Sequence, residues 1–343
     1  MKKLINTLYV TTPEAYLALD GENVVVLRDG DVLGRHPLHN LEAIVSFNYP
    51  GASPALMGAC VERGVELCFF TPTNRFLARV DGGTHGSLAL RRTQFDWALD
   101  PARRLRVAQF FITGKIYNAR WVVERTLRDH AERVEAEKLG MVSRRLADYA
   151  RGVGTSADVD ALRGLEAVAA SAYFSIFDDM IIGDKASFRF EGRNRRPPLD
   201  RVNALLSFAY ALLARETASA LTGVGLDPYL GFMHADRAGR ASLALDMMEE
   251  LRAPFADRFV LSLINRRMLD PKSFTRKEDG AILMSDDLRK LFLTNWQERK
   301  KEIITHPYLG EKLSWGLVPH AQALLLSRWM RGDIDGYPPF LWK

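Results

Sequence analysis

The spacing of apolar residues changes once along the chain, and this change limits the possible folds more than any other feature. Up to about residue 90, short apolar runs alternate with Asp-Gly pairs at 20–21 and 29–30, which is a strong hairpin signal. From about Asp100 onward, apolar residues recur every three or four positions, as in helices. The pattern predicts an α+β multidomain protein, in which a small antiparallel β domain (1–90) precedes a larger all-α domain (91–343).

The N-terminal pattern is detailed enough to place individual elements. A helix is expected from Pro54 to about Arg63, behind Ser53. Another is expected to begin at Pro101, with Asp100 as its N-cap. Strands are expected at 15–19, 24–27, 43–47, 65–71 and 75–80.

Composition restricts the class of protein without identifying it. The 343 residues are 47% hydrophobic and 26% charged, which is ordinary for a globular protein. No apolar run approaches the roughly 20 residues that span a bilayer, and the first residues lack a signal-peptide pattern, so we expect a cytoplasmic protein. Cys60 and Cys68 match no zinc spacing and are expected to be buried thiols. The net charge of +5 permits an anionic partner where arginines cluster.

Two stretches of the helical half carry acidic residues in apolar surroundings. Glu166 lies in GLEAVAASAYF, and a buried carboxylate needs a partner: Arg163, a more distant arginine, or a metal ion. In GFMHADRAGRASLALDMMEELR, Asp246 has Glu249 and Glu250 at helical spacing behind it. Like charges at this spacing need a cation between them, and either Arg252 or a divalent ion would serve. Together with His234, such carboxylates suit Mn²⁺ or Mg²⁺ better than zinc.

A third stretch, RFEGRNRRPPLD, is a basic loop before a helix expected at 201–214. Arginines of this kind hold phosphates in bidentate fashion, and the two prolines stiffen the loop. A solvated surface loop is the alternative interpretation. Asn203 and Tyr210, on the following helix, either orient a ligand or simply pack.

The order of these blocks resembles the CRISPR-associated integrase/endonuclease family of spacer acquisition. The resemblance is carried by GLEAVAASAYF, GRNRRPPLDRVNALLSFAYALL, GLDPYLGFMHADRAGRASLALDMMEELRAPFADR and FTRKEDGAILMSDDLRK. The C-terminal stretch from His306 to Lys343 looks most like the type I-C branch. The resemblance covers the helical half, and the family also carries a β-rich N-terminal region.

The resemblance implies site residues and partners. Glu166, His234 and Glu249 would be catalytic ligands of Mg²⁺ or Mn²⁺, with Asp246 supporting His234. Tyr173 and Asn203 would support the site, and Glu250 would face solvent or pair with a cation. The expected DNA-binding residues are Arg189, Arg193, Arg195, Arg196, Arg252 and Arg258. The partners would be double-stranded DNA, a second copy bound through the β domain, and a smaller adaptation protein that completes a heterohexamer.

The implied reaction is phosphodiester transesterification, which inserts captured DNA into a CRISPR repeat, with hydrolysis when water replaces the hydroxyl. Two other functions remain open: a metal-dependent repair nuclease with the same residues, and a non-catalytic DNA-binding scaffold. Covalent catalysis, with Tyr173 or Tyr210 as the nucleophile, is an alternative mechanism, which a metal site makes unnecessary. His306 and His320 are expected to be structural or specific to the branch.

Overall fold

The structure is a computed structural model that describes residues 7–72, 76–80, 82, 88–194, 197–235 and 237–343. The chain divides into two compact units. The first comprises Met1–Thr84 and Ser285–Glu302, and the second comprises His85–Met284 and Ile303–Lys343. One segment from the helical half of the sequence therefore belongs to the first unit.

The first unit is built from strands and short helices. Their bounds are β1 Thr7–Val10, β2 Tyr16–Asp20, β3 Asn23–Arg28, β4 Asp31–Pro37, η1 Leu38–Asn40, β5 Ala43–Ser46, α1 Pro54–Arg63, β6 Glu66–Phe70, β7 Phe76–Val80 and α9 Asp286–Lys301. One sheet has the order β2-β3-β4 and is antiparallel. The other has the order β1-β5-β6-β7. Apolar side chains from both sheets and α1 form one core, which includes Leu17, Val24, Ile44, Leu56 and Leu67.

The predicted fold class is confirmed, with N-terminal strands followed by a mostly helical region. The two Asp-Gly pairs do form turns, since Gly21 and Gly30 have φ of +57° and +90°, where glycine is favoured. Pairing in the four-stranded sheet is mixed, because β1, β5 and β6 run parallel and only β6–β7 is antiparallel. Helix α1 bridges β5 and β6, and a parallel pair needs a crossover of this kind. Cys60 and Cys68 are buried, as expected, and neither is part of a disulfide.

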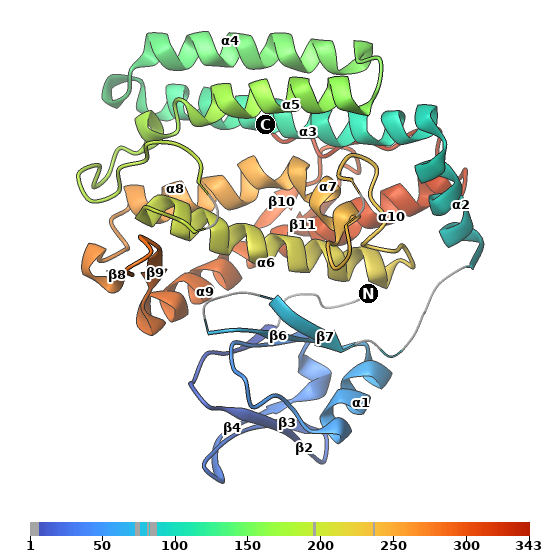
Figure 1. Ribbon diagram of the computed structural model, residues 1–343, viewed down its shortest axis with the longest axis vertical. Coiled ribbons are helices and arrows are strands. Elements are labelled where there is room, and N and C mark those ends of the chain that lie inside the picture. The colour runs from blue at the N-terminus through green and yellow to red at the C-terminus, as the bar shows by residue number, and fades with distance from the viewer. Residues whose placement is uncertain (1–6, 73–75, 81, 83–87, 195–196, 236) are drawn as a thin grey trace. The chain divides into compact units, whose positions relative to one another are not determined.

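The second unit is mainly helical (Figure 1). Its longer helices are α2 Leu88–Leu99, α3 Pro101–His130, α4 Ala136–Gly152, α5 Val159–Phe174, α6 Arg201–Gly223, α7 Ser242–Leu251, α8 Arg258–Asn265 and α10 Val318–Met330. The short elements are η2 Ala131–Arg133, η3 Val153–Thr155, η4 Asp178–Met180, the π-helical η5 Arg252–Asp257, β8 Phe274–Arg276, η6 Pro271–Ser273, β9 Ile282–Met284, β10 Ile303–Thr305, β11 Lys312–Ser314 and η7 Trp315–Leu317. Within the described part of the chain, we find no helix with the length and apolar character that crossing a bilayer requires.

Helix α3 is the element around which this unit is organised (Figure 1). It begins as expected, with Pro101 in its first turn and the Asp100 carboxylate accepting from the N–H groups of Ala102 and Arg103. It packs against α4 and α5 as well as against α7 and η5. Contact on several sides requires an extensive apolar surface, and Val107, Phe111 and Ile116 are almost completely buried. Any polar residue on these faces of α3 is therefore held inside the unit.

Candidate functional site

Two of the predicted ligands meet at a lysine that the sequence did not single out. Glu166 on α5 and Glu249 on α7 both contact the ammonium group of Lys115 on α3. The distance from Lys115 Nζ to Glu249 Oε2 is 2.7 Å. The Lys115, Glu166 and Glu249 side chains are 15%, 21% and 4% exposed, so this cluster is largely shielded from water. Three helices distant in sequence thus bring two carboxylates to one positive charge.

Glu249 is held in its ionised form by two cations. Burial acts to raise the pKa of this carboxyl, but Arg252, at 3.0 Å from its Oε1, and Lys115 outweigh burial and lower the pKa to about 2. His234 also acts to lower the pKa of Glu249, which places that ring in the electrostatic neighbourhood of this carboxylate. Arg252 is thus the counter-ion that the helical spacing suggested. For Glu166, however, the partner is Lys115 rather than Arg163, which contacts Asp160 and the carbonyl of Met233.

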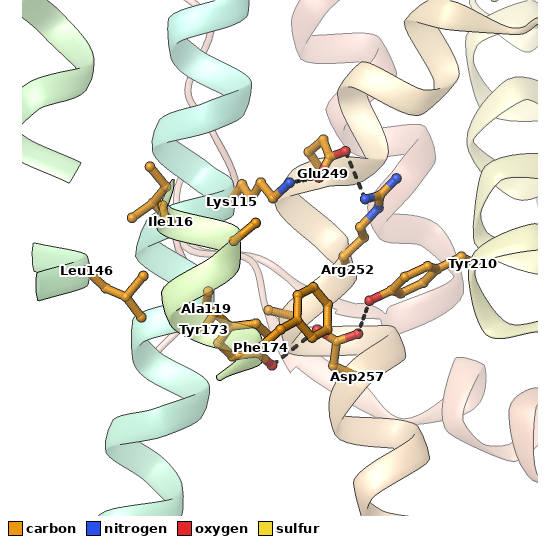
Figure 2. A pocket seen from close by; sticks show the side chains of 13 residues that line it. Lys115, Ile116, Ala119, Leu146, Tyr173, Phe174, Tyr210, Glu249, Arg252 and Asp257 are labelled. Carbon is orange, nitrogen blue, oxygen red and sulfur yellow. Dashed lines mark hydrogen bonds and ion pairs between the residues drawn. The ribbon is translucent and has the colours of Figure 1, made fainter. Parts of the chain in front are cut away.

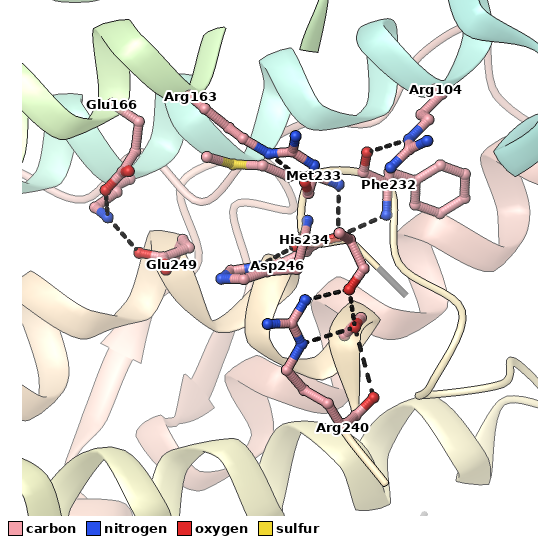
Figure 3. A network of polar contacts seen from close by, with 12 residues as sticks. Arg104, Arg163, Glu166, Phe232, Met233, His234, Arg240, Asp246 and Glu249 are labelled. Atoms are coloured by element: carbon pink, nitrogen blue, oxygen red, sulfur yellow. Dashed lines mark hydrogen bonds and ion pairs between the residues drawn. The ribbon is translucent and has the colours of Figure 1, made fainter. Parts of the chain in front are cut away.

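His234 is positioned by a buried aspartate (Figure 3). Asp246 accepts hydrogen bonds from the backbone N–H groups of Phe232, Met233 and His234, at 2.6, 2.9 and 3.0 Å. Its Oδ1 also lies 2.5 Å from His234 Nδ1. With Nδ1 occupied in this way, Nε2 is the ring nitrogen available to a ligand. Gly231 permits this approach, since a Cβ there would lie 2.9 Å from Asp246 Oδ2.

Two arginines fix the same loop from other helices (Figure 3). Arg104 on α3 donates to the carbonyl of Phe232 at 2.8 Å, and Arg163 on α5 donates to that of Met233 at 2.9 Å. The sequence had assigned neither role. Because α3, α5 and α7 each hold this loop, His234 is connected to the same three helices that carry Lys115, Glu166 and Glu249.

These residues fit a divalent cation in the chemistry of their donors. Two carboxylates converge on a single positive charge, and Glu249 Oε2 is buried 2.7 Å from the Lys115 ammonium nitrogen. An imidazole oriented by a carboxylate is a common partner of such oxygen ligands. Across the described ranges, however, no three His, Cys, Asp or Glu side chains are grouped closely enough to hold a metal ion. Lys115 supplies the cationic charge between the glutamates here.

A small cavity of about 40 Å³ lies beside Lys115 and Arg252 (Figure 2). Tyr173 and Tyr210 lie on its wall and donate their hydroxyl protons to Asp257, at 3.1 and 2.6 Å. Burial raises the pKa of Asp257 to about 6, although the two hydroxyls act to lower it. Burial also raises the pKa of each tyrosine well above its ordinary value, so both phenols keep their protons. This protonation disfavours either tyrosine as a nucleophile.

The predicted DNA-binding arginines lie in different environments. Arg189 is largely exposed and pairs with Glu191 at 3.4 Å. Arg193 is partly buried, bonds to Asn203 Oδ1 at 2.6 Å and lies over the ring of Tyr210. Arg252 also lies over the Tyr210 ring and is bound to Glu249, and Arg258 lies over Trp342. Residues 195 and 196 fall outside the described residues, so the predictions for Arg195 and Arg196 have no structural counterpart.

Asn203 holds the basic loop. Its amide donates to the carbonyl of Gly192 at 2.8 Å, and its Oδ1 accepts from the backbone N–H of Asn194 at 3.1 Å. Asp200 caps the helix at Asn203 N, as expected for an N-cap. The helix extends to Gly223, nine residues beyond the predicted end at 214.

The expectation for Glu250 is wrong. This residue is completely buried and contacts neutral groups: the hydroxyl of Tyr337, the amide of Gln322 at 3.1 Å, and the N–H of Phe340 at 2.7 Å. Burial raises its pKa to about 7. Gly114 on α3 allows the approach, since a Cβ there would lie 2.7 Å from Glu250 Cβ. Glu250 therefore anchors the C-terminal segment. His306 is also buried and bonded to Gln322, in agreement with a structural role.

Comparisons with known proteins agree with the blocks noted in the sequence. The family model described as CRISPR associated protein Cas1 matches residues 8–298. The chain is 49% identical, over all of both chains, to CRISPR-associated endonuclease Cas1 1 of Chlorobaculum tepidum. Among solved structures, a casposase bound to integration product aligns with a TM-score of 0.85 and 18% identity, covering 99% of this chain and 95% of that one. A Cas6-RT-Cas1–Cas2 complex aligns with a TM-score of 0.82 and 21% identity, covering 100% of this chain and 36% of that one.

Proposed function

The chain belongs to the Cas1 family of CRISPR-associated endonucleases, and from this premise we propose that it is a metal-dependent DNA integrase. It joins captured DNA fragments to a CRISPR repeat array by phosphodiester transesterification, and hydrolyses DNA when water is the nucleophile. The observation that carries the proposal is the convergence of Glu166 and Glu249 on one buried positive charge, beside a histidine that Asp246 orients.

Glu166, Glu249 and His234 would hold Mg²⁺ or Mn²⁺. When bound, the ion polarises a phosphoryl oxygen and lowers the pKa of the attacking or leaving hydroxyl. Glu249 is ready for this role because its pKa of about 2 keeps it ionised at neutral pH. Asp246 fixes the ring of His234 so that Nε2 carries the free lone pair.

The remaining cations would act on the phosphate. In the reaction, the 3′-hydroxyl of the fragment forms a new P–O bond while the bond to the 3′-oxygen of the repeat strand breaks. Overall, the proton lost by the attacking hydroxyl is gained by the leaving one. Lys115 and Arg252 lie beside Glu249 and would offset the negative charge that develops on the phosphate. The high pKa of both tyrosines supports direct transfer without a protein–DNA ester.

DNA contacts and partners belong to the same proposal. Arg189, Arg193, Arg195, Arg196, Arg252 and Arg258 would hold the DNA backbone. The casposase of similar fold is bound to an integration product, which supports a DNA substrate for this chain. The similar Cas6-RT-Cas1 chain is in complex with Cas2, which supports a smaller adaptation protein as partner. We further propose a homodimer through residues 1–90, a catalytic region at 91–343, a heterohexamer with the adaptation protein, type I-C membership and a cytoplasmic location.

Strand joining tests this function. A labelled duplex is incubated with the protein, its adaptation partner and a plasmid that carries a CRISPR repeat, with Mg²⁺, Mn²⁺ or chelator. Glu166→Ala, His234→Ala and Glu249→Ala should each lower joining at least about a hundredfold while circular dichroism stays unchanged. Glu250→Gln is the matched control, because it is a buried acid on the same helix outside the cluster. Undiminished joining by His234→Ala, or joining that persists in chelator, contradicts the proposal.

A further inference from the structure

A second and more polar cleft, of about 350 Å³, lies between the C-terminal end of α3 and α8. Four arginines line it: Arg125, Arg133, Arg258 and Arg266. Among the described lining residues, Asp129 is the one carboxylate. Its carboxylate bonds Arg128, which is not a lining residue, at 2.9 Å and lies 3.7 Å from Arg125, so it offsets at most one of the four lining charges. The cleft therefore has a strong excess of positive charge.

Three of the four guanidinium groups are held in place by contacts within the protein. Arg125 and Arg258 lie over the same indole ring, that of Trp342, at 4.9 and 4.6 Å from its centre. Arg133 donates to the carbonyl of Ile182 at 2.7 Å. Such fixed, planar donors suit phosphate, which accepts two parallel hydrogen bonds from one guanidinium. Gathering several like charges in one concavity also favours an anionic ligand that offsets their repulsion.

The cleft continues the line of the proposed active site along α3. Lys115, Ile116 and Ala119 line the small cavity beside the glutamates. The next residues at three- and four-residue spacing, Val122, Arg125, Thr126 and Asp129, line the basic cleft. This spacing keeps them on one face of the helix.

The opposite wall is also one continuous stretch of chain. Glu249, Arg252, Ala253 and Asp257, from α7 and η5, line the small cavity, and Arg258, Leu261, Ser262, Asn265 and Arg266, from α8 and the residue after it, line the cleft. The two spaces therefore follow each other between the same two walls.

We propose that this cleft binds a backbone phosphate of the DNA whose reacting phosphate lies at Glu166 and Glu249. The proposal rests on the function proposed above. Lys115 and Arg125 are ten residues apart on α3, which corresponds to about 15 Å along the helix axis. At about 3.4 Å per base step, the bound phosphate lies roughly four nucleotides from the reacting one. The strand belongs either to the captured fragment or to the repeat, and both present the same phosphate chemistry.

Binding of a branched DNA that mimics the joined product tests the cleft. Arg266→Glu is the chief variant, because this side chain is exposed and lines the cleft near the end of α8. It should weaken binding about tenfold at moderate salt and reduce the slope of log affinity against log salt by about one. Asp129→Asn should act in the opposite direction and strengthen binding about threefold. Arg145→Glu, an equal charge change at an exposed site on α4, should alter affinity less than twofold.

Shortening one arm of the branched DNA at a time identifies the strand. When the arm that reaches the cleft is cut to two base pairs, Arg266→Glu should bind the DNA as tightly as the wild type does. Cutting the other arms should leave the loss of affinity in Arg266→Glu unchanged. The proposal is overturned if Arg266→Glu binds like Arg145→Glu, or if its deficit is independent of every arm. Strand joining by the wild-type protein is measured in parallel. If the wild-type protein does not join strands, the proposed function is wrong. If it joins strands normally and Arg266→Glu leaves the DNA affinity unchanged, only the proposal for the cleft is wrong.

Discussion

Glu249 and Glu250 are neighbours in sequence, both buried on α7, and yet their carboxyl groups have opposite electrostatic environments. Glu249 faces Lys115 and Arg252, and its pKa is lowered to about 2. Glu250 faces a phenol, an amide and a backbone N–H, and its pKa is raised to about 7. Cations stabilise a buried carboxylate far better than neutral donors do.

The difference shows how one helix serves two purposes. Lys115, Glu166, Glu249 and Arg252 form what we call the charged cluster. It keeps the Glu249 carboxylate ionised, as the proposed metal ligand requires. We call the second group the neutral cluster, and it consists of Glu250, Gln322 and Tyr337. It holds the C-terminal segment against α7. Asn118 on α3 extends this anchoring, since its amide donates to the carbonyls of Glu250 and Phe340, each at 2.6 Å. The residue type is the same in both clusters, so the function follows from what other helices place opposite it.

Removing Lys115 should break the charged cluster. Lys115→Met leaves Glu166 and Glu249 facing each other without the cation they share, and we expect a loss of about 3 kcal/mol in the free energy of unfolding. Added Mn²⁺ should restore part of that loss, because a ligand that binds the folded state stabilises it. The measurement is denaturant unfolding in chelator and in Mn²⁺.

Lys138→Met provides the comparison for this variant. Lys138 pairs with Asp179 at 2.6 Å but is 43% exposed, so its removal should cost at most about 1 kcal/mol. Equal losses for both lysine variants, or a Lys115→Met protein that Mn²⁺ does not stabilise more than the wild type, would show that Lys115 does not balance the two glutamates.

Most of the fold was accessible from sequence because it depends on local signals. The Asp-Gly turns, the Ser53 and Asp100 caps and the helical period are each contained in a few residues. Two features are not local. The parallel pairing of β1 with β5 depends on residues over thirty positions apart, and the assignment of Ser285–Glu302 to the first unit depends on contacts across most of the chain.

The candidate site was only partly accessible for the same reason. His234, Asp246 and Glu249 share one block of sequence, but Lys115 lies fifty-one residues before Glu166 and in no recognised motif. A signal was present, since Lys115 stands among the buried residues Phe111, Ile112 and Ala119 on α3. A lysine within an apolar stripe needs an acid from elsewhere. Glu250 was misjudged because helical spacing specifies neighbours on the same helix and nothing about Tyr337 or Phe340.

The neutral cluster should make the free energy of unfolding depend on pH. The folded state holds the Glu250 proton up to about pH 7, whereas an ordinary glutamate releases it near 4.5. Its stabilising contribution is therefore complete below pH 4.5 and is lost as the pH rises through 7, by about 3 kcal/mol in total. In Glu250→Gln this titration is absent. Relative to Glu250→Gln, the wild-type protein should thus lose about 3 kcal/mol of unfolding free energy between pH 4.5 and about pH 8.

Taking the difference between two proteins cancels other titrating groups, including Asp257, whose pKa is also raised. Glu278→Gln, at an exposed position, should follow the wild-type pH profile in parallel. A constant difference between wild type and Glu250→Gln over this range would mean that Glu250 is ionised in the folded protein, and the contrast with Glu249 would disappear.

The smallest effect is expected from the hydroxyl of Tyr337. Tyr337→Phe removes one donor to Glu250 and one acceptor for Gln322 Nε2, at 2.7 Å, and should lower the free energy of unfolding by about 1–2 kcal/mol. Tyr308→Phe, at a position 55% exposed, should change it by less than about 0.5 kcal/mol. Because the charged cluster has its own cations, strand joining by folded Tyr337→Phe should stay within twofold of wild type. A joining defect as deep as that of Glu249→Ala would mean that the two clusters act as one unit, since the loss of a neutral donor would then have reached the carboxylate of the neighbouring Glu249.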